Sequence, residues 1–376
     1  MIVVLGAGLI GLAVAFELAT RGARVRVFDS GEAARGASWA GAGMLAPYAE
    51  RLDDDPAFEA LCLASLNGYP AFVERVRACG SVDAHLRLDG ILDAAFDDAG
   101  DGRIRARVNR LRARGVDIRY VDRRDALALE PALAPSTLGA SLCAAEGAVD
   151  NRRLGRALVA ACRALGVRVD TGVRDLALEA DARRVLGIRT ADGFAAADVV
   201  VNALGAWASE LRGVPDVARA AIVPVKGQMV ALAAPRGFVR HVTWAPGVYV
   251  VPRDDGRVLL GATVERVGFD VRLTARGTRD LLAAGLAAMP ALGDFTLAES
   301  WAGLRPATPD GLPYIGATGL GGYLLACGHY RNGILLAPVT ATAIADLIGG
   351  VDRADLAPFA PLRAKEAVMP PAKVAL

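Results

Sequence analysis

The chain has 376 residues, of which 53% are hydrophobic and 22% are charged, and its formal net charge is +2. This length suits two domains or one large domain with an insertion, and the composition excludes a wholly disordered chain. The near-neutral charge argues against a protein that binds nucleic acid through bulk positive charge. The five cysteines form no CxxC pair and only three histidines are present, so we expect no disulfide framework, no metal site and a reducing, cytoplasmic setting.

The first sixteen residues are all apolar or glycine. No basic region precedes this run, and Glu17 and Arg21 end it before the roughly 20 residues that a membrane span requires. Three glycines also divide it. We therefore predict a buried strand, a turn and a helix here, rather than a signal peptide or a membrane anchor.

The first thirty residues have the pattern of a dinucleotide-binding unit. Ile2–Leu5 is a predicted strand and Gly6–Gly11 reads G-x-G-x-x-G. Leu9–Thr20 is a predicted helix, and Arg24–Phe28 is a second strand followed by Asp29. The strand, the glycine turn, the helix and the terminal acid together favour dinucleotide binding over an ordinary glycine-rich loop.

Each residue of this motif has a physical role. Gly6 permits a tight turn, Gly8 lets backbone N–H groups approach a pyrophosphate, and Gly11 allows the helix to pack close to the strand. Asp29 is placed to accept hydrogen bonds from an adenosine ribose, and an acid there disfavours a 2′-phosphate. The motif alone does not separate NAD from FAD.

A stretch of small residues follows, in which Ser30-Gly31-Glu32 leads into Arg35–Met44, with the sequence RGASWAGAGM. An NAD enzyme would be expected to have another helix and strand at this point. Small side chains instead let the backbone approach a large bound group closely. The segment therefore favours FAD.

The rest of the chain alternates between helical and β-rich patterns. The predicted helices are Pro56–Cys79, Arg103–Arg114, Arg152–Leu165 with Asp150 as its N-cap, Ala275–Met289 and Ile334–Ile348. The predicted strands are Leu86–Ala95, which is interrupted by Asp89-Gly90, Val167–Val169, Ile222–Ala231, Val248–Pro252, Val258–Gly261, Phe295–Arg305 and Tyr323–Ala326. Asp198–Trp207 is predicted as a buried strand that runs into a glycine turn.

The predicted fold class is α/β (α+β overall), with a Rossmann-type FAD-binding domain interleaved with a β-rich antiparallel substrate domain. We expect the FAD-binding domain to be discontinuous and to comprise residues 1–45, 145–215 and 300–350. The substrate-binding domain is expected at 46–144 and 216–299. Residues 351–376, which contain four prolines, are expected to form a C-terminal tail.

Several motifs, in this order and spacing, resemble those of the D-amino-acid-oxidase-like FAD oxidoreductases. They are Gly6–Gly11, Gly41–Leu45, Pro224–Gln228, Tyr249–Arg253, Gly261–Thr263, Trp301–Pro306, Asp310–Gly316 and Gly328–Pro338. The nearest likeness is to the glycine oxidase branch of this family, which serves thiamine biosynthesis. The whole set is much more specific than the glycine motif by itself.

The resemblance implies oxidation of a C–N bond adjacent to a carboxylate. We therefore expect FAD-dependent oxidative deamination of glycine and other small amines or amino acids, such as sarcosine and small D-amino acids. A hydride would pass from Cα to flavin N5, giving an imine and, with O2, H2O2, and the glycine imine would feed thiazole formation. Two alternatives stay open: a D-amino-acid dehydrogenase that passes electrons to a quinone, and a non-oxidase flavin-binding protein of the same fold.

Three side chains resemble the family's catalytic residues. Arg305 follows an apolar strand, and its planar guanidinium is suited to bind the substrate carboxylate bidentately. By resemblance, Tyr249 supports the same carboxylate and Arg331 is a second active-site arginine near substrate and flavin. His329 is not expected to act as a base, because hydride transfer from a neutral amine requires no side chain to abstract the Cα proton.

The resemblance also implies non-covalent FAD, because no cysteine shortly precedes Thr308-Pro309-Asp310 as in the sarcosine-oxidase branch. The N-terminus of the helix from Ile334 is expected to face the N1/C2=O edge of the flavin. The expected partners are a small amino-acid substrate and O2, without nucleic acid or membrane, and a homo-oligomer is left open. The residues that resemble the cofactor-binding positions are Gly6, Gly8, Leu9, Ile10, Gly11, Asp29, Ser30, Ala37, Ser38, Ala42, Gly43, Met44, Val173, His329, Tyr330, Arg331, Asn332, Gly333, Ile334 and Leu335.

Overall fold

The computed structural model describes residues 1–50, 55–361 and 363. Its first sheet is formed by β1 (Ile2–Leu5), β2 (Val25–Phe28), β9 (Arg168–Asp170), β13 (Val199–Asn202), β19 (Tyr314–Ala317) and β20 (Tyr323–Cys327). The strand order is β19-β20-β13-β1-β2-β9, and all neighbours are parallel except β19 and β20. The carboxyl ends of β1, β2, β13 and β20 therefore lie at one edge of the sheet.

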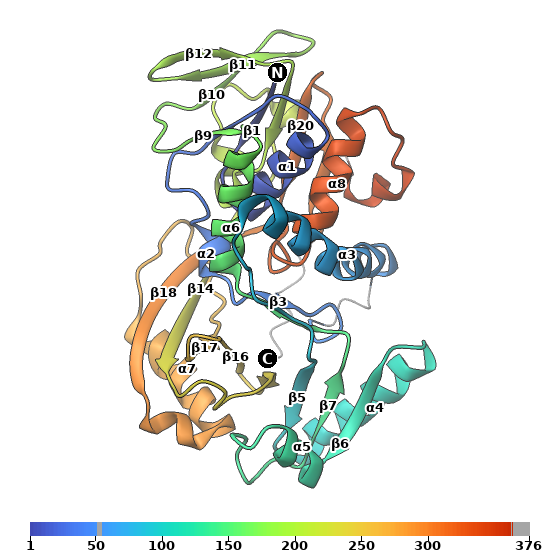
Figure 1. Cartoon of the computed structure of the whole chain (residues 1–376), viewed down its shortest axis with the longest axis vertical. Coiled ribbons are helices and arrows are strands. Elements are labelled where there is room, and N and C mark those ends of the chain that lie inside the picture. The colour runs from blue at the N-terminus through green and yellow to red at the C-terminus, as the bar shows by residue number, and fades with distance from the viewer. Residues whose placement is uncertain (51–54, 362, 364–376) are drawn as a thin grey trace.

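Helices cover one face of this sheet, and a small antiparallel sheet covers the other (Figure 1). The helices are α1 (Leu9–Thr20), α3 (Pro56–Gly80), α6 (Asn151–Ala164) and α8 (Ala337–Ile348). The small sheet consists of β10 (Ala177–Ala180), β11 (Val185–Thr190) and β12 (Gly193–Ala196). Helix α1 packs against β1 and β2 and also against α6 and α8, so it is apolar on nearly every face.

The second sheet forms the other half of the molecule, the lower half of Figure 1. Its strands are β5 (Ile91–Ala95), β6 (Ile118–Asp122), β7 (Gly139–Cys143), β14 (Val223–Ala233), β15 (Val242–Ala245), β16 (Val248–Pro252), β17 (Arg257–Gly261) and β18 (Thr296–Ala307). They follow the order β18-β14-β17-β16-β15-β5-β7-β6, and only β15 and β5 are parallel. Helices α4 (Asp98–Ala113), α5 (Arg123–Leu129) and α7 (Ala275–Ala288) pack on this sheet.

Short elements join the two halves. Helix α2 (Ala37–Ala40) lies against β18 and α6. Strand β3 (Met44–Leu45) pairs with β8 (Gly147–Val149), which also pairs with β4 (Leu86–Arg87). The segment that follows β2 therefore touches both halves of the molecule.

The predicted α/β fold with parallel and antiparallel sheets is confirmed. The apolar N-terminal run forms β1, the glycine turn and α1 with the predicted bounds. The predicted N-cap is also confirmed, because Asp150 accepts a hydrogen bond from the amide of Arg153 at 2.9 Å. None of the described helices combines the length and hydropathy that a membrane span needs.

The interruption predicted at Asp89-Gly90 is confirmed. Leu86–Ala95 is divided into two strands, β4 and β5, because Gly90 between them has a φ of 95° and breaks the extended backbone. Other elements differ from the prediction. The helix predicted from Ile334 begins only at Ala337. Strands β3, β6, β7, β8, β10, β11, β12, β15 and β19 and helices α2 and α5 are not predicted by the sequence, because their short segments lack a clear period.

Two expected domain assignments differ from the packing of the structure. Strand β18 pairs with β14 along its length in the second sheet, although residues 300–350 are expected in the FAD-binding domain. Helix α3 packs on α6 and α8 and adds Phe58 to the core of the first half, although residues 46–144 are expected in the substrate domain. Sequence pattern does not reveal which half a connecting helix or strand packs against.

The expected C-terminal tail is partly structured. Residues Ala354–Phe359 form a 3-10 helix. Phe359 is buried, and the centroid of its ring lies 6.3 Å from that of Phe58. Apolar burial of one aromatic residue thus ties this segment to the first half. Residues 362 and 364–376 lie outside the described part of the chain.

The packing of α1 on β1 depends on Gly11. A Cβ atom at Gly11 would overlap the carbonyl oxygen of Gly6 in the turn before the helix. Gly68, in the middle of α3, faces open space instead. The same substitution at these two helix positions should therefore have opposite effects on stability.

We expect Gly11→Ala to lower the free energy of unfolding by about 1–3 kcal/mol, because the helix must move away from the turn. Gly68→Ala is the matched control and should raise it by about 0.5–1 kcal/mol, since alanine loses less backbone entropy in a helix. Denaturant titration of both variants measures the two effects. A Gly11→Ala variant as stable as the wild type would contradict the close packing.

Candidate active site

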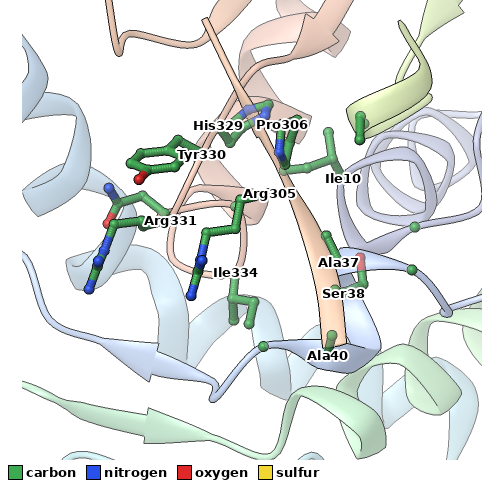
Figure 2. Close-up of a pocket in the computed structure, with 18 of the residues that line it drawn as sticks. Ile10, Ala37, Ser38, Ala40, Arg305, Pro306, His329, Tyr330, Arg331 and Ile334 are labelled. Carbon is green, nitrogen blue, oxygen red and sulfur yellow. The ribbon is translucent and has the colours of Figure 1, made fainter. Parts of the chain in front are cut away.

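A pocket lies where the carboxyl ends of the first sheet face the second sheet. Its lining comes from the ends of β1, β2, β13 and β20, from residues 35–46, and from β14, β16 and β18. Ligands commonly bind at this edge of an open α/β sheet. Figure 2 shows Ile10, Ala37 and Ser38 on one side of the pocket and Arg331 and Tyr330 on the other.

The glycine-rich end of the pocket offers unpaired backbone donors. The amides of Gly8 and Ile10 have no acceptor among the described residues, whereas the amide of Leu9 donates to Ser38 Oγ at 2.8 Å. Free N–H groups and the positive end of the helix dipole together bind phosphate groups. This end of the pocket therefore fits the diphosphate of a dinucleotide.

Asp29, at the end of β2, lies on the lining next to Ser30. Its carboxylate accepts hydrogen bonds from the amides of Ala7 at 2.6 Å and Gly31 at 2.7 Å. Each carboxylate oxygen retains a further acceptor site. Asp29 can therefore hold the glycine turn in place and still accept a hydrogen bond from a ribose hydroxyl.

The segment of residues 36–44 is held against β18. Trp301 on β18 donates from its indole N–H to the carbonyl oxygen of Ala40 at 2.9 Å. A Cβ atom at Gly303 would overlap the side chain of Ala40. This close approach requires a small residue at position 40.

Arg253, at the carboxyl end of β16, holds the same segment from another side. Its guanidinium donates to the carbonyl oxygen of Ala42 at 2.7 Å and to Oδ1 of Asn151 at 2.8 Å. Burial lowers the pKa of Arg253 to about 10, so the group stays charged at neutral pH. Arg253 lies within a motif of the family resemblance, but this positioning role is not predicted from the sequence.

The turn between β20 and α8 forms another wall. The amides of Gly333 and Ile334, which line the pocket, donate to no acceptor among the residues that the structure describes. Helix α8 begins at Ala337 because the hydrogen bonds across residues 329–336 keep this segment in successive turns. The free amides of the turn, rather than the helix N-terminus, are thus available to an electron-rich edge such as that of a flavin. Together with the glycine-rich end, they fit FAD.

Arg305 extends from β18 into the pocket (Figure 2). Its Nη1 donates to the carbonyl oxygen of Thr263 at 3.1 Å and to that of Lys226 at 3.4 Å. Gly227 makes room for it, because a Cβ atom there would overlap the guanidinium. Within the described ranges Arg305 has no carboxylate partner, so its charge is available to a bound carboxylate.

Tyr249 on β16 faces the same end of the pocket and is 5% exposed. Its hydroxyl donates to Sδ of Met229 at 3.3 Å. Burial raises the pKa of Tyr249, and the charges of Arg305 and Arg331 act in the opposite direction. The hydroxyl therefore remains protonated and is influenced by both guanidinium groups.

Arg331 lies beside Arg305 in the pocket but is already paired (Figure 2). Its Nε and Nη2 donate to the two carboxylate oxygens of Glu50 at 2.7 and 3.2 Å. Burial by itself lowers the pKa of Arg331, but the Glu50 carboxylate more than offsets this and raises it above its usual range. The two arginines predicted as catalytic thus differ, because only one of them has its charge compensated.

His329 lines the pocket, and its Nε2 shares a hydrogen bond of 3.0 Å with Thr340 Oγ1 of α8. Burial lowers the pKa of His329 to about 3, so the ring is neutral near pH 7. A neutral ring held by α8 fits the interpretation of His329 as a structural residue. Burial raises the pKa of the Cys327 thiol to about 12, which disfavours covalent attachment of a cofactor through this residue.

Four residues predicted to bind the cofactor do not line the pocket. Leu9 and Leu335 are in the hydrophobic core of the first half, and Gly11 packs on the turn before α1. Val173 is in the core on the other face of the sheet, and its amide donates to the carbonyl oxygen of Asp29 at 3.0 Å. The remaining predicted residues lie on the lining: Gly6, Gly8, Ile10, Asp29, Ser30, Ala37, Ser38, Ala42, Gly43, Met44, Tyr249, Arg305, His329, Tyr330, Arg331, Asn332, Gly333 and Ile334.

Glu50 and Met229 line the pocket and are not predicted from the sequence. Glu50 pairs with Arg331, which is 281 positions further along the chain. No local sequence pattern can indicate a contact between residues so far apart along the chain. The one available signal is a lone acid that ends the apolar stretch after Met44.

The turn that carries Glu50 is anchored by a second carboxylate. Oε1 of Glu146 accepts hydrogen bonds from the amides of Tyr48 at 2.5 Å and Ala49 at 3.0 Å. Glu146 is fully buried, and its Oε2 has no partner among the described residues. Burial raises the pKa of Glu146 to about 7, although the two amides favour the charged form.

The raised pKa of Glu146 has a definite effect on stability. The unfolded chain releases this proton near pH 4.5 and the folded chain near pH 7, so this residue stabilises the fold at low pH and loses that contribution as the pH rises between these values. We expect Glu146→Gln to become more stable relative to the wild type by up to roughly 3 kcal/mol across this window.

Denaturation midpoints of both proteins between pH 4.5 and pH 8 measure this difference. Glu210→Gln, at an exposed position, is the control and should show no such trend. A stability difference between Glu146→Gln and the wild type that does not change with pH would contradict the raised pKa.

Residues 1–347 match the protein family described as FAD dependent oxidoreductase. The chain is 38% identical over 364 residues to the glycine oxidase of Pseudomonas putida, and the match covers 96% of this chain and 98% of that protein. It is 37% identical over 353 residues to the bifunctional protein ThiO/ThiG of Synechocystis. That match covers 92% of this chain and 51% of the relative, so the chain spans about half the length of the bifunctional protein.

The crystal structure of glycine oxidase from Geobacillus kaustophilus is similar over both halves of the molecule. The TM-score is 0.91 at 34% sequence identity, and the match covers 96% of this chain and 98% of that chain. The same pocket offers the free amides and the acidic residue that a flavin dinucleotide requires. The chain therefore belongs to the family of FAD-dependent oxidoreductases, with FAD as its cofactor.

Proposed function

We propose that this protein catalyses the oxidative deamination of glycine and other small amines or amino acids, such as sarcosine and small D-amino acids. The observation that carries the proposal is Arg305, whose guanidinium lies in the pocket without a carboxylate partner among the described residues. A planar guanidinium binds a carboxylate bidentately and so fixes its orientation. The substrate is therefore a molecule that presents a carboxylate to this group.

The second sheet supplies the groups that orient the substrate. Arg305 comes from β18 and Tyr249 from β16. The Tyr249 hydroxyl remains protonated and can exchange its hydrogen bond to Met229 Sδ for one to the same carboxylate. Met229 from β14 closes the space beside them. Fixing one end of a small substrate in this way aligns its Cα–H bond with the cofactor at little entropic cost in the reaction itself.

The first sheet supplies the residues that would hold FAD without a covalent bond. These are the glycine turn, Asp29, the segment of residues 36–44 and the amides of Gly333 and Ile334. When bound, FAD would supply the acceptor for the hydride of the substrate Cα and the route for its two electrons to O2; the products would be an imine, which hydrolyses, and H2O2. His329 is neutral and bonded to Thr340, and in this proposal no side chain removes the Cα proton.

The proposed metabolic role is the supply of the glycine imine for thiazole formation in thiamine biosynthesis. Support comes from the similarity to half of a protein named ThiO/ThiG. We also propose a cytoplasmic location, which the five free cysteines support because they suit a reducing compartment.

The proposed reaction is tested by mixing the holoenzyme with glycine, sarcosine, D-alanine or D-proline in the absence of oxygen. We expect at least one of them to bleach the visible flavin band, and air to restore the band with formation of H2O2. Bleaching that is restored by a quinone but not by air would favour a dehydrogenase instead. A flavoprotein that none of these compounds reduces would contradict the proposal.

The role of Arg305 is tested by Arg305→Leu. We expect kcat/KM for glycine to fall by about 100-fold or more, about 3 kcal/mol, because a charge-assisted pair with the substrate carboxylate is lost. Arg305→Lys should be intermediate, since it keeps the charge but not the planar fork. Steady-state kinetics measures the loss, and retention of the flavin absorbance shows that the fold is intact. Arg189→Leu, on an exposed ion pair with Glu179, is the matched control and should be unaffected.

A further inference from the structure

The charged groups at the substrate end of the pocket partly neutralise one another. Among the described lining residues, this end contains two cations, Arg305 and Arg331, and one anion, Glu50. Glu50 and Arg331 form a two-point pair, and their side chains are only 10% and 18% exposed. One uncompensated positive charge, that of Arg305, therefore remains for a substrate.

We propose that Glu50 determines substrate specificity, by masking Arg331 and thereby restricting the pocket to amino acids with a single carboxylate. The inference rests on the proposed function and concerns the class of its substrate. One carboxylate neutralises Arg305. A second carboxylate would have to displace Glu50 from Arg331 or lie uncompensated beside it, and both arrangements are costly in a partly dry site.

The position of Glu50 is built into the fold. Its own amide donates to the carbonyl oxygen of Ala46 at 2.9 Å. The two preceding amides, those of Tyr48 and Ala49, donate to the buried carboxylate of Glu146. The turn therefore presents Glu50 to Arg331 even before a substrate binds, so the masking does not depend on the ligand.

Among the described residues, Glu50 is the carboxylate that pairs with Arg331, so a neutral side chain at position 50 would leave the charge of Arg331 uncompensated. The Arg331 guanidinium carbon lies 5.9 Å from the centroid of the Trp244 ring. The positive charges of Arg331 and Arg305 both act to lower the pKa of Tyr249. Two guanidinium groups thus lie around one side chain in the pocket. A substrate with two carboxylates would then find a second uncompensated cation among the residues that line the pocket.

The test compares two N-substituted glycines of equal size, iminodiacetate and its monoamide, which differ by one carboxylate charge. We expect the wild type to use the monoamide with a kcat/KM at least tenfold higher. In Glu50→Gln, which keeps the side-chain shape but removes the charge, the ratio of iminodiacetate to monoamide should rise at least tenfold. Glu17→Gln removes the charge of another buried, ion-paired glutamate that lies outside the pocket, and it should leave the ratio within twofold of the wild type.

A binding measurement gives a readout that is independent of turnover. Isothermal titration calorimetry of the holoenzymes with malonate and malonamate, which are not amines, should show the same change in preference between the wild type and Glu50→Gln. The dissociation constant of malonate relative to malonamate should fall at least tenfold in Glu50→Gln. If Glu50→Gln is poorly folded, Glu50→Ala tests the same expectation.

The outcomes separate this inference from the proposed function. If the wild type oxidises glycine but uses iminodiacetate and its monoamide equally, or if the ratio is unchanged in the Glu50 variants, the specificity role is wrong and the oxidase activity stands. If no amine is oxidised, the proposed function fails, and the malonate titration still decides whether Glu50 masks Arg331.

Discussion

The arrangement of the two halves of this molecule depends on close packing around the segment of residues 36–44. This segment follows β2 in the first sheet, lies against β18 of the second, and lines the pocket between them. Trp301, Arg253 and Asn151 all bond to its backbone or to each other around it. Because its small residues allow the backbone to be approached from three sides, one short segment can position a cofactor site and a substrate site relative to one another.

The two arginines of the pocket show how the surroundings assign different roles to the same residue type. Arg305 is held by the carbonyl oxygens of Thr263 and Lys226, which position the guanidinium without cancelling its charge. Arg331 is held by the carboxylate of Glu50, which positions it and also neutralises it. Arg305 is half-buried and has no carboxylate partner among the described residues, so a bound carboxylate would supply the missing counter-charge.

The local parts of this structure could be predicted from the sequence. The unit from β1 to Asp29 is defined by neighbours within thirty residues, and its glycines are required by a close approach that the structure shows at Gly11 and Gly6. The start of α8 could not be predicted in the same way, because Ile334 and its neighbours are held in turns that form a pocket wall. Short strands such as β7, which contains Gly139 and Ala140, have weak intrinsic preference for β-structure and exist because both neighbours pair with them.

By itself, the sequence determined the dinucleotide-binding motif, the mixed α/β class and the residue types able to hold a flavin and a carboxylate, because these depend on local backbone geometry and on side-chain chemistry. Only the tertiary structure decided that β18 belongs to the second sheet, that Val173 packs in the core on the other face of the first sheet, and that Glu50 compensates Arg331 but not Arg305. Charge compensation depends on spatial distances between groups that are far apart along the chain. These distances are set by folding and cannot be derived from local sequence.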